Sequence, residues 1–258
     1  MTSFPRFAGK HDHGDLVSPA ALRAWREARG MLPKRVPDAV VLLYQDGLFD
    51  AVNAFEPTTV VGQHGVYRHT VTLDRTGGRL GVAGRFGYGA PMAALVMEDL
   101  AALGTTRFVS MGTAGSLQPD LGPGAVVVCT GAVRDEGVSH HYTPADVEAR
   151  PDPALTEALD RTARAAGLEP RRGSTWTIDT PYRETAAEAL HYRDAGVACV
   201  EMEAAGLFAV AAHRGVAVAS AFCMSDTIID GTWDGHFDHP ALAHNLLTLY
   251  GAAVEALA

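Results

Sequence analysis

Short apolar runs alternate along the chain with segments in which apolar residues recur every three or four positions. The short runs are rich in Val, Ala and Leu, which indicates buried strands, whereas the recurring pattern predicts amphipathic helices. Because apolar strands alternate with helices, the pattern predicts an α/β layered fold with a largely parallel or mixed sheet. The predicted strands are residues 39–44, 65–73, 80–83, 107–111, 125–130, 172–178, 198–200 and 216–224, and the predicted helices are residues 18–30, 91–103, 152–167, 185–195, 204–213 and 240–257.

Two of the predicted helices carry signals at both ends. Ser18-Pro19 and Asp152-Pro153 each combine an N-cap side chain with proline at the first helical position, and Gly30 and Gly167 close the same segments. No internal repeat, low-complexity tract or Ser/Gly linker separates the elements. We therefore expect a single domain over residues 1–258, in which residues 1–30 form an N-terminal arm and helix.

The composition is that of a globular protein with an acidic surface. Its 258 residues are 47% hydrophobic, and 21 Lys and Arg against 30 Asp and Glu give a net charge of −9. A nucleic-acid binder or a protein of anionic membrane surfaces would carry a basic patch, so both partners are disfavoured. The N-terminus lacks the apolar core of a signal peptide, and every apolar run falls below the roughly 18 residues of a membrane span. We expect a cytoplasmic protein.

Neither the cysteines nor the histidines form a recognisable metal site. The three cysteines lie far apart in the sequence, and their odd number suits a reducing compartment. His140-His141 and the pair His11 and His13 have no cysteine or carboxylate at a ligand spacing nearby. The sequence therefore predicts no metal and no cofactor.

Two glycine-containing segments follow predicted strands, where ligands of α/β sheets bind. In residues 84–91, the glycines would let backbone N–H groups approach an anion at the start of a helix. In residues 112–116, small side chains would let a ligand lie against the backbone while a hydroxyl orients it. The first segment matches neither a Rossmann nor a P-loop spacing, and taken alone it is better interpreted as an ordinary strand-to-helix turn.

Carboxylates stand in two apolar stretches. Glu201 and Glu203 are two residues apart, a spacing that places both on one face of an extended segment. An unpaired buried carboxylate is costly, which favours a ligand role over an ion pair or a helix N-cap. Ser225-Asp226 ends the apolar run 216–224, where the carboxylate is well placed for proton transfer or, alternatively, for capping a turn.

These segments together resemble the purine-nucleoside/uridine phosphorylase family. Gly112-Thr113-Ala114-Gly115, Val200-Glu201-Met202-Glu203-Ala204-Ala205 and Ser225-Asp226 have the order and spacing of its motifs, from about residue 40 to the C-terminus. The resemblance implies a three-layer α/β/α fold with a mixed, partly barrel-like sheet. It also implies cleavage of the N-glycosidic bond of a nucleoside, usually with phosphate as the nucleophile. Members of the family work as trimers or hexamers, often assembled from dimers, so we expect a homo-oligomer.

The resemblance assigns roles to the acidic motif and to Asp226. Glu203 is expected to bind the ribose hydroxyls, Met202 to pack against the sugar, and Glu201 to lie near the base. Asp226 matches the acid that protonates or hydrogen-bonds the leaving base in the purine-specific branch. Cleavage of a glycosidic bond passes through an oxocarbenium-like state, and two carboxylates in different environments suit this chemistry.

Other positions carry over from the same motifs. Thr113 matches a hydroxyl that faces the phosphate or the nucleophile, and Ala114 and Gly115 match backbone on the base side. Tyr182 falls in the loop that covers the base, and Ser225 precedes the acid. His13, or alternatively His11, resembles a histidine that reaches the 5′-hydroxyl in a neighbouring subunit.

The chain departs from the family where phosphate is bound. Phe49 and Ser110 stand at two arginine positions of the family, and His64 stands near the position of a third arginine, which a neighbouring subunit donates. Without arginines a phosphate dianion loses its strongest bidentate partners. Arg85, Arg68 and His64 are the candidates for a substitute anion site.

Three hypotheses follow from this comparison. The first is a nucleoside phosphorylase with a rebuilt phosphate site, which releases the base and a sugar 1-phosphate. The second is a nucleoside hydrolase in which water replaces phosphate. The third is a nucleoside-binding protein without catalysis, against which the presence of Glu203 and Asp226 argues. The sequence leaves purine or pyrimidine open as the base.

Overall fold

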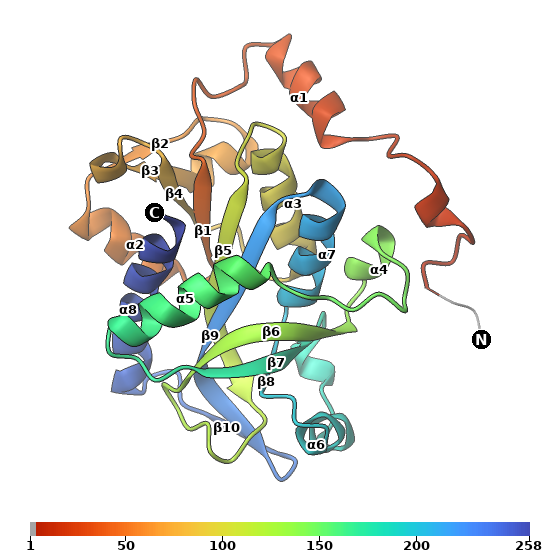
Figure 1. Ribbon diagram of the computed structural model, residues 1–258, viewed down its shortest axis with the longest axis vertical. Helices are drawn as coiled ribbons and strands as arrows, with labels where there is room; N and C mark the ends of the chain where they lie inside the picture. The colour runs from red at the N-terminus through yellow and green to blue at the C-terminus, as the bar shows by residue number, and fades with distance from the viewer. Residues whose placement is uncertain (1–3) are drawn as a thin grey trace.

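A ten-stranded sheet forms the centre of the computed structural model, which describes residues 4–258 (Figure 1). The strand order is β10-β9-β6-β7-β8-β5-β1-β4-β3-β2. Parallel pairs such as β1 with β5 and antiparallel pairs such as β6 with β9 both occur, so the sheet is mixed. The strands are β1 (Ala39–Leu43), β2 (Thr58–Val60), β3 (Thr70–Leu73), β4 (Leu80–Ala83), β5 (Arg107–Ser116), β6 (Val126–Asp135), β7 (Arg171–Ile178), β8 (Cys199–Glu201), β9 (Ala217–Ile229) and β10 (Thr232–Gly235).

Part of the sheet closes on itself. Besides its neighbours β10 and β6, strand β9 also pairs in parallel with β5, so that β9, β6, β7, β8 and β5 form a ring. This ring is the partly barrel-like sheet that the sequence led us to expect. Because β5 and β9 each belong to both the ring and the open sheet, residues on them face two environments.

Helices cover both faces of the open part of the sheet. In β1, Val41 and Leu43 pack with α2, α5 and α8, whereas Val40 and Leu42 pack with α3 and α7. This alternation gives the three layers of the fold, as Figure 1 shows. The helices are α1 (Pro19–Glu27), α2 (Asp46–Phe55), α3 (Ala90–Ala101), α4 (Ser139–Tyr142), α5 (Pro153–Ala165), α6 (Ala186–Asp194), α7 (Ala204–Arg214) and α8 (Pro240–Leu257), with short 3-10 turns η1 (Lys10–Asp12), η2 (Gly65–His69), η3 (Asp74–Thr76) and η4 (Pro181–Arg183).

The strand predicted over residues 65–73 was wrong in its first half. Gly65 has a φ of 54° and opens the 3-10 turn η2, and the Thr70 hydroxyl donates a hydrogen bond back to the Val66 carbonyl. Helix α2 was missed altogether, although its apolar residues Leu48, Phe49 and Val52 are buried against the sheet. Tertiary burial, rather than a signal at its ends, defines this helix.

From the sequence we expected residues 112–116 and 225–226 to be loops that follow strands. In the structure both segments belong to long strands. β5 runs through Ser116 and β9 runs through Ile229. Their register shifts at one place, where Ala114 pairs with Met224 and Gly115 pairs with Asp226, so that Ser225 is an extra residue on β9. Such a β-bulge redirects side chains and is common beside active sites.

The N-terminal arm lies against α4 and α7 of its own chain. The Lys10 ammonium is 2.7 Å from Nδ1 of His141, and Asp15 pairs with Arg214 at 2.8 Å. Helix α1 begins at the predicted cap, where the Ser18 hydroxyl accepts the Ala21 N–H. Among residues 4–258, none of the helices combines the length and the apolar character that crossing a bilayer requires.

Candidate active site

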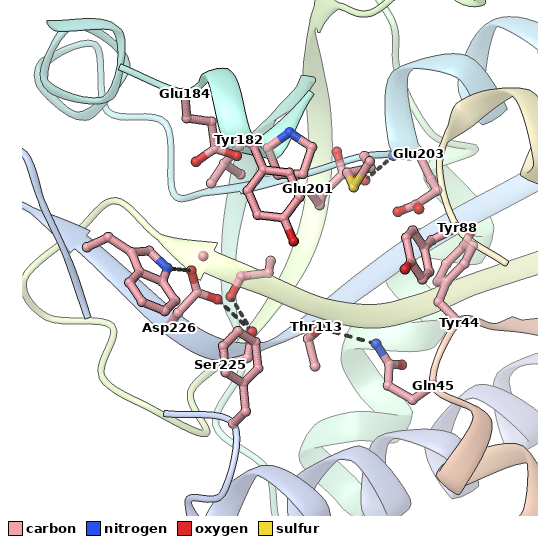
Figure 2. Close-up of a pocket in the computed structure, with 17 residues that line it drawn as sticks. Tyr44, Gln45, Tyr88, Thr113, Tyr182, Glu184, Glu201, Glu203, Ser225 and Asp226 are labelled. Atoms are coloured by element: carbon pink, nitrogen blue, oxygen red, sulfur yellow. Dashed lines mark hydrogen bonds between the residues drawn. The ribbon is translucent and has the colours of Figure 1, made fainter. Parts of the chain in front are cut away.

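A cavity of about 830 Å³ opens where the ring of strands meets the start of α7 (Figure 2). Its walls come from β5, β8, β9, β10 and the segments that follow β1 and β7, which are far apart in the sequence. The lining residues are Tyr44, Gln45, Tyr88, Thr113, Ala114, Gly115, Pro181, Tyr182, Glu184, Val200, Glu201, Met202, Glu203, Ser225, Asp226, Trp233 and Phe237.

Glu203 is a buried carboxylate that lines this cavity. It occupies the N-cap position of α7, is 6% exposed, and accepts a hydrogen bond from the Gly89 amide to Oε1 at 2.6 Å. Gly89 has a φ of 94°, which glycine adopts readily, so the glycine-rich segment reaches Glu203 through its backbone. Burial, together with the neighbouring charge of Glu201, raises the pKa of Glu203. Oε2 has no protein hydrogen bond within residues 4–258 and remains available for a ligand.

Glu201 organises the turn from β8 into α7. Its Oε2 accepts the amides of Glu203 and Ala204, each at 2.8 Å, and its Oε1 accepts the Thr177 hydroxyl at 2.5 Å. Burial raises the pKa of Glu201, while these donors act against the rise. The N-cap interaction considered for Glu203 is therefore made by Glu201, whose carboxylate is occupied by the protein rather than open to a base.

Asp226 lies on the other side of the cavity from Glu203 (Figure 2). The Ser225 hydroxyl is 2.7 Å from its Oδ1, and the Trp233 indole donates to its Oδ2 at 3.0 Å. A Cβ on Gly115 would lie 2.9 Å from Oδ2, so the carboxylate occupies space that only glycine leaves open. The β-bulge and this glycine together aim Asp226 into the cavity.

The end of the cavity near β1 is neutral and hydrogen-bonded. The Gln45 amide donates to the Thr113 hydroxyl at 3.1 Å, and the Tyr44 hydroxyl is 2.8 Å from that of Ser110. Burial and the charges of Glu203 and Glu201 raise the pKa of Tyr44 well above its usual value, so its phenol stays protonated. Ser110 is 1% exposed and lies behind Tyr44, outside the cavity lining.

Phe49 fills the position at which the resemblance places an arginine. Its ring packs on Gly84 so closely that a Cβ there would lie 2.5 Å from Phe49 Cδ2. The side chain is 7% exposed and belongs to the core under α2. An apolar contact thus replaces a cation beside the glycine-rich segment.

The proposed substitute cations and the N-terminal histidine lie away from this cavity. Arg85 forms an ion pair with Asp50, and both side chains are about half exposed. His64 is exposed at the start of η2. His13 lines a separate cavity with His141 and His213. Of residues 4–258, no Arg, Lys or His lines the active-site cavity, and no His, Cys, Asp and Glu cluster has an arrangement suited to a metal ion.

Glu184, Trp233 and Phe237 are among the lining residues that the sequence did not point to. Trp233 lies on β10, the second strand of a hairpin, and Phe237 follows that strand; the turn residues Asp230 and Gly231 have φ values of 53° and 73°. An Asp-Gly dipeptide between strands is a strong hairpin signal, and it would have located β10. Glu184 follows η4 and lies two residues after Tyr182, in the loop that the resemblance places over the base.

Comparison with known proteins assigns the family. Residues 35–257 match the Phosphorylase superfamily, so the chain belongs to that family. It is 34% identical to guanosine phosphorylase of Halorubrum lacusprofundi over 150 residues, which cover 58% of this chain and 62% of that protein. It is 33% identical to uridine phosphorylase of Haemophilus influenzae over 144 residues, which cover 50% of this chain and 57% of that protein. In both cases the match spans less than two thirds of the relative.

A solved structure shares this fold over most of the chain. The crystal structure of uridine phosphorylase from Vibrio fischeri superposes with a TM-score of 0.71 at 22% identity, over 86% of this chain and 92% of that one. The expected α/β/α fold with a mixed, partly barrel-like sheet is therefore confirmed.

Proposed function

We propose that this protein cleaves the N-glycosidic bond of a nucleoside. The observation that carries the proposal is a single cavity with a buried, partly unoccupied carboxylate, Glu203, on one side and Asp226 on the other. Glu203 would accept hydrogen bonds from the ribose diol and stabilise positive charge on the sugar. Asp226 would donate a proton or a hydrogen bond to the base, so that it does not leave as an anion.

Phosphate is the acceptor that family membership supports. In that reaction the bond from C1′ to the base nitrogen breaks, a phosphate oxygen bonds to C1′, and the products are the base and a sugar 1-phosphate. Thr113 and the neutral end of the cavity would then face the acceptor. The guanosine and uridine phosphorylases among the relatives agree with this assignment.

Water is a second candidate, and the charge of the cavity favours it. The cavity lining contains the carboxylates Glu184, Glu201, Glu203 and Asp226 but, among residues 4–258, no cation. A phosphate dianion would meet like charges without arginine partners. A water molecule carries no such penalty, and its attack on C1′ would release the free sugar and the base.

The test is a panel of nucleosides with and without phosphate, in which free base, free sugar and sugar 1-phosphate are quantified. We expect phosphate to saturate only in the millimolar range or above, equivalent to at most about 4 kcal/mol of binding, and base release to persist without it. Arg85→Ala should change the rate of base release by no more than about twofold, both with and without phosphate, because Arg85 pairs with Asp50 outside the cavity. Strict phosphate dependence with micromolar saturation would contradict the water candidate. Nucleoside binding without any base release would leave only a binding function.

Asp226→Ala should lower base release more for poor leaving bases than for activated ones. A general acid contributes most when the leaving group is strongly basic, typically 10²- to 10⁴-fold. The measurement is kcat/KM across nucleosides whose bases differ in basicity, including an aryl riboside with an acidic leaving group. Equal losses across this series would mean that Asp226 has only a structural role.

A further inference from the structure

A second cavity, of about 450 Å³, lies between the N-terminal arm and the residues of α4 and α7 that face it. We call it the arm cavity; Figure 1 shows the arm beside α4. It brings together histidines that stand out in the sequence and that the proposed function leaves unused. Its side chains able to carry a charge near neutral pH are Lys10, His11, His13, Asp15, His141 and His213. Basic groups therefore outnumber carboxylates here, although the chain as a whole has a net charge of −9.

Lys10, in η1, and His141, in α4, meet on one side of the arm cavity. The Lys10 ammonium is 2.7 Å from Nδ1 of His141. Because an ammonium can only donate, Nδ1 accepts, and the proton of the neutral His141 ring is on Nε2. Neither side chain makes another hydrogen bond or ion pair with any of residues 4–258. Two ammonium hydrogens and the Nε2 hydrogen of His141 therefore remain for a ligand.

The α4 side of the arm cavity is positive. Burial lowers the pKa of His141, and so do the like charges of its neighbours, Lys10 first among them. Within residues 4–258, no carboxylate pairs with either residue. Asp15 lies on the α7 side, where it pairs with Arg214 at 2.8 Å. A cleft with unpaired charge of one sign concentrates ligands of the opposite sign, so this side favours an anion.

We propose that the α4 side of the arm cavity binds a phosphate group, either as free phosphate or as part of a small phosphate ester. A phosphate group carries about −1.5 to −2 charges near pH 7 and has three strong acceptor oxygens, which match the three free hydrogens of Lys10 and His141. Charge-assisted hydrogen bonds are roughly twice as strong as neutral ones, and lysine is a common phosphate ligand. The cavity is larger than a phosphate ion requires, so the remainder of an ester fits beside Phe7. The bound group would hold the arm on α4.

Calorimetric titrations at pH 7 and constant ionic strength test this proposal with inorganic phosphate, ribose 5-phosphate and acetate. We expect both phosphate compounds to bind with dissociation constants in the millimolar range or below, and acetate, with one charge and two oxygens, to bind at least about tenfold more weakly. Tighter binding of ribose 5-phosphate would identify an ester as the ligand, and the reverse order would identify free phosphate. Lys10→Gln and His141→Ala should each weaken the binding of phosphate about tenfold, as for the loss of one charged hydrogen bond.

Lys34→Gln is the matched control, since Lys34 is the other lysine of the chain and is exposed outside the arm cavity. It should leave all three affinities unchanged. Dissociation constants above about 10 mM for both phosphate compounds, or phosphate affinities that neither Lys10→Gln nor His141→Ala lowers, would overturn the inference. Acetate that binds as tightly as phosphate would overturn it as well.

The inference does not depend on the proposed function. Among residues 4–258, the arm cavity and the active-site cavity share no lining residue. Base release by Lys10→Gln should therefore equal that of the wild type, both with and without phosphate. Because the affinities are measured without a nucleoside, failure of the arm site and failure of the proposed function are separate results.

Discussion

Glu203→Gln should remove most of the base-releasing activity and should raise the free energy of unfolding at neutral and alkaline pH. The activity falls because the amide carries no charge to stabilise a cationic sugar in the transition state, so kcat should decrease more than affinity. We expect a loss of about 10²- to 10³-fold, the size seen when one preorganised electrostatic group is removed. The Gly89 amide can still donate to the glutamine carbonyl, which preserves the backbone contact.

The gain in stability follows from the raised pKa of Glu203. Between the unfolded pKa and the higher folded pKa, the native state holds more protons than the unfolded state, so stability falls as pH rises. Glutamine cannot ionise, so the variant escapes this loss. Its advantage over the wild type should be absent at pH 4, grow through neutral pH and reach about 1 kcal/mol or more at pH 9.

Urea denaturation of both proteins at pH 4, 7 and 9, with kcat measured at pH 7, checks both parts. Asp50→Asn is a suitable control, because Asp50 is exposed and pairs with Arg85 outside the cavity. A Glu203→Gln protein with normal turnover would reject the sugar-binding role. A constant stability difference from pH 4 to pH 9 would mean that Glu203 ionises normally in the folded protein.

The sequence predicted three of the four acidic residues that line the site, Glu201, Glu203 and Asp226, because the chemistry of these three is local. An unpaired carboxylate in an apolar run is costly to bury wherever that run lies in the fold, so such a residue indicates a site. Glu203 and Asp226 do line one cavity. The predicted helix caps at Ser18 and Asp152 also formed, since a cap depends on residues three positions away. Patterns that act within a few residues were sufficient for these features.

Other features depend on distant partners and could not be predicted in this way. The bulge at Ser225 exists only because β9 pairs with β5, more than a hundred residues earlier. The hydrogen bond from Gln45, at the start of α2, to Thr113 on β5 likewise joins segments that are far apart in the sequence. The sequence separates Glu201 from Glu203 by two residues, yet only the folded turn distinguishes the carboxylate that holds the backbone from the one open to a ligand.

That distinction predicts that the same substitution at Glu201 has the opposite effect on stability. Oε1 of Glu201 accepts the Thr177 hydroxyl, and Oε2 accepts the amides of Glu203 and Ala204. The Thr177 oxygen in turn accepts the Ala205 amide, which orients its own proton toward Glu201. Both oxygens of Glu201 must therefore be acceptors, a condition that an ionised carboxylate meets and an amide does not.

In Glu201→Gln, one end of the amide must present an NH2 group either to Thr177 or to the two backbone amides. At least one buried donor then loses its acceptor, which costs about 1–3 kcal/mol. For a chain of this size we expect the melting temperature to fall by roughly 2–12 °C at pH 7. Base release should fall as well, because the Glu203 amide loses the contact that fixes the carboxylate for which we propose sugar binding. Thermal unfolding of the two glutamine variants side by side is the decisive measurement. Equal or greater stability of Glu201→Gln would mean that Glu201 is protonated in the native protein and that Glu203 carries the charge instead.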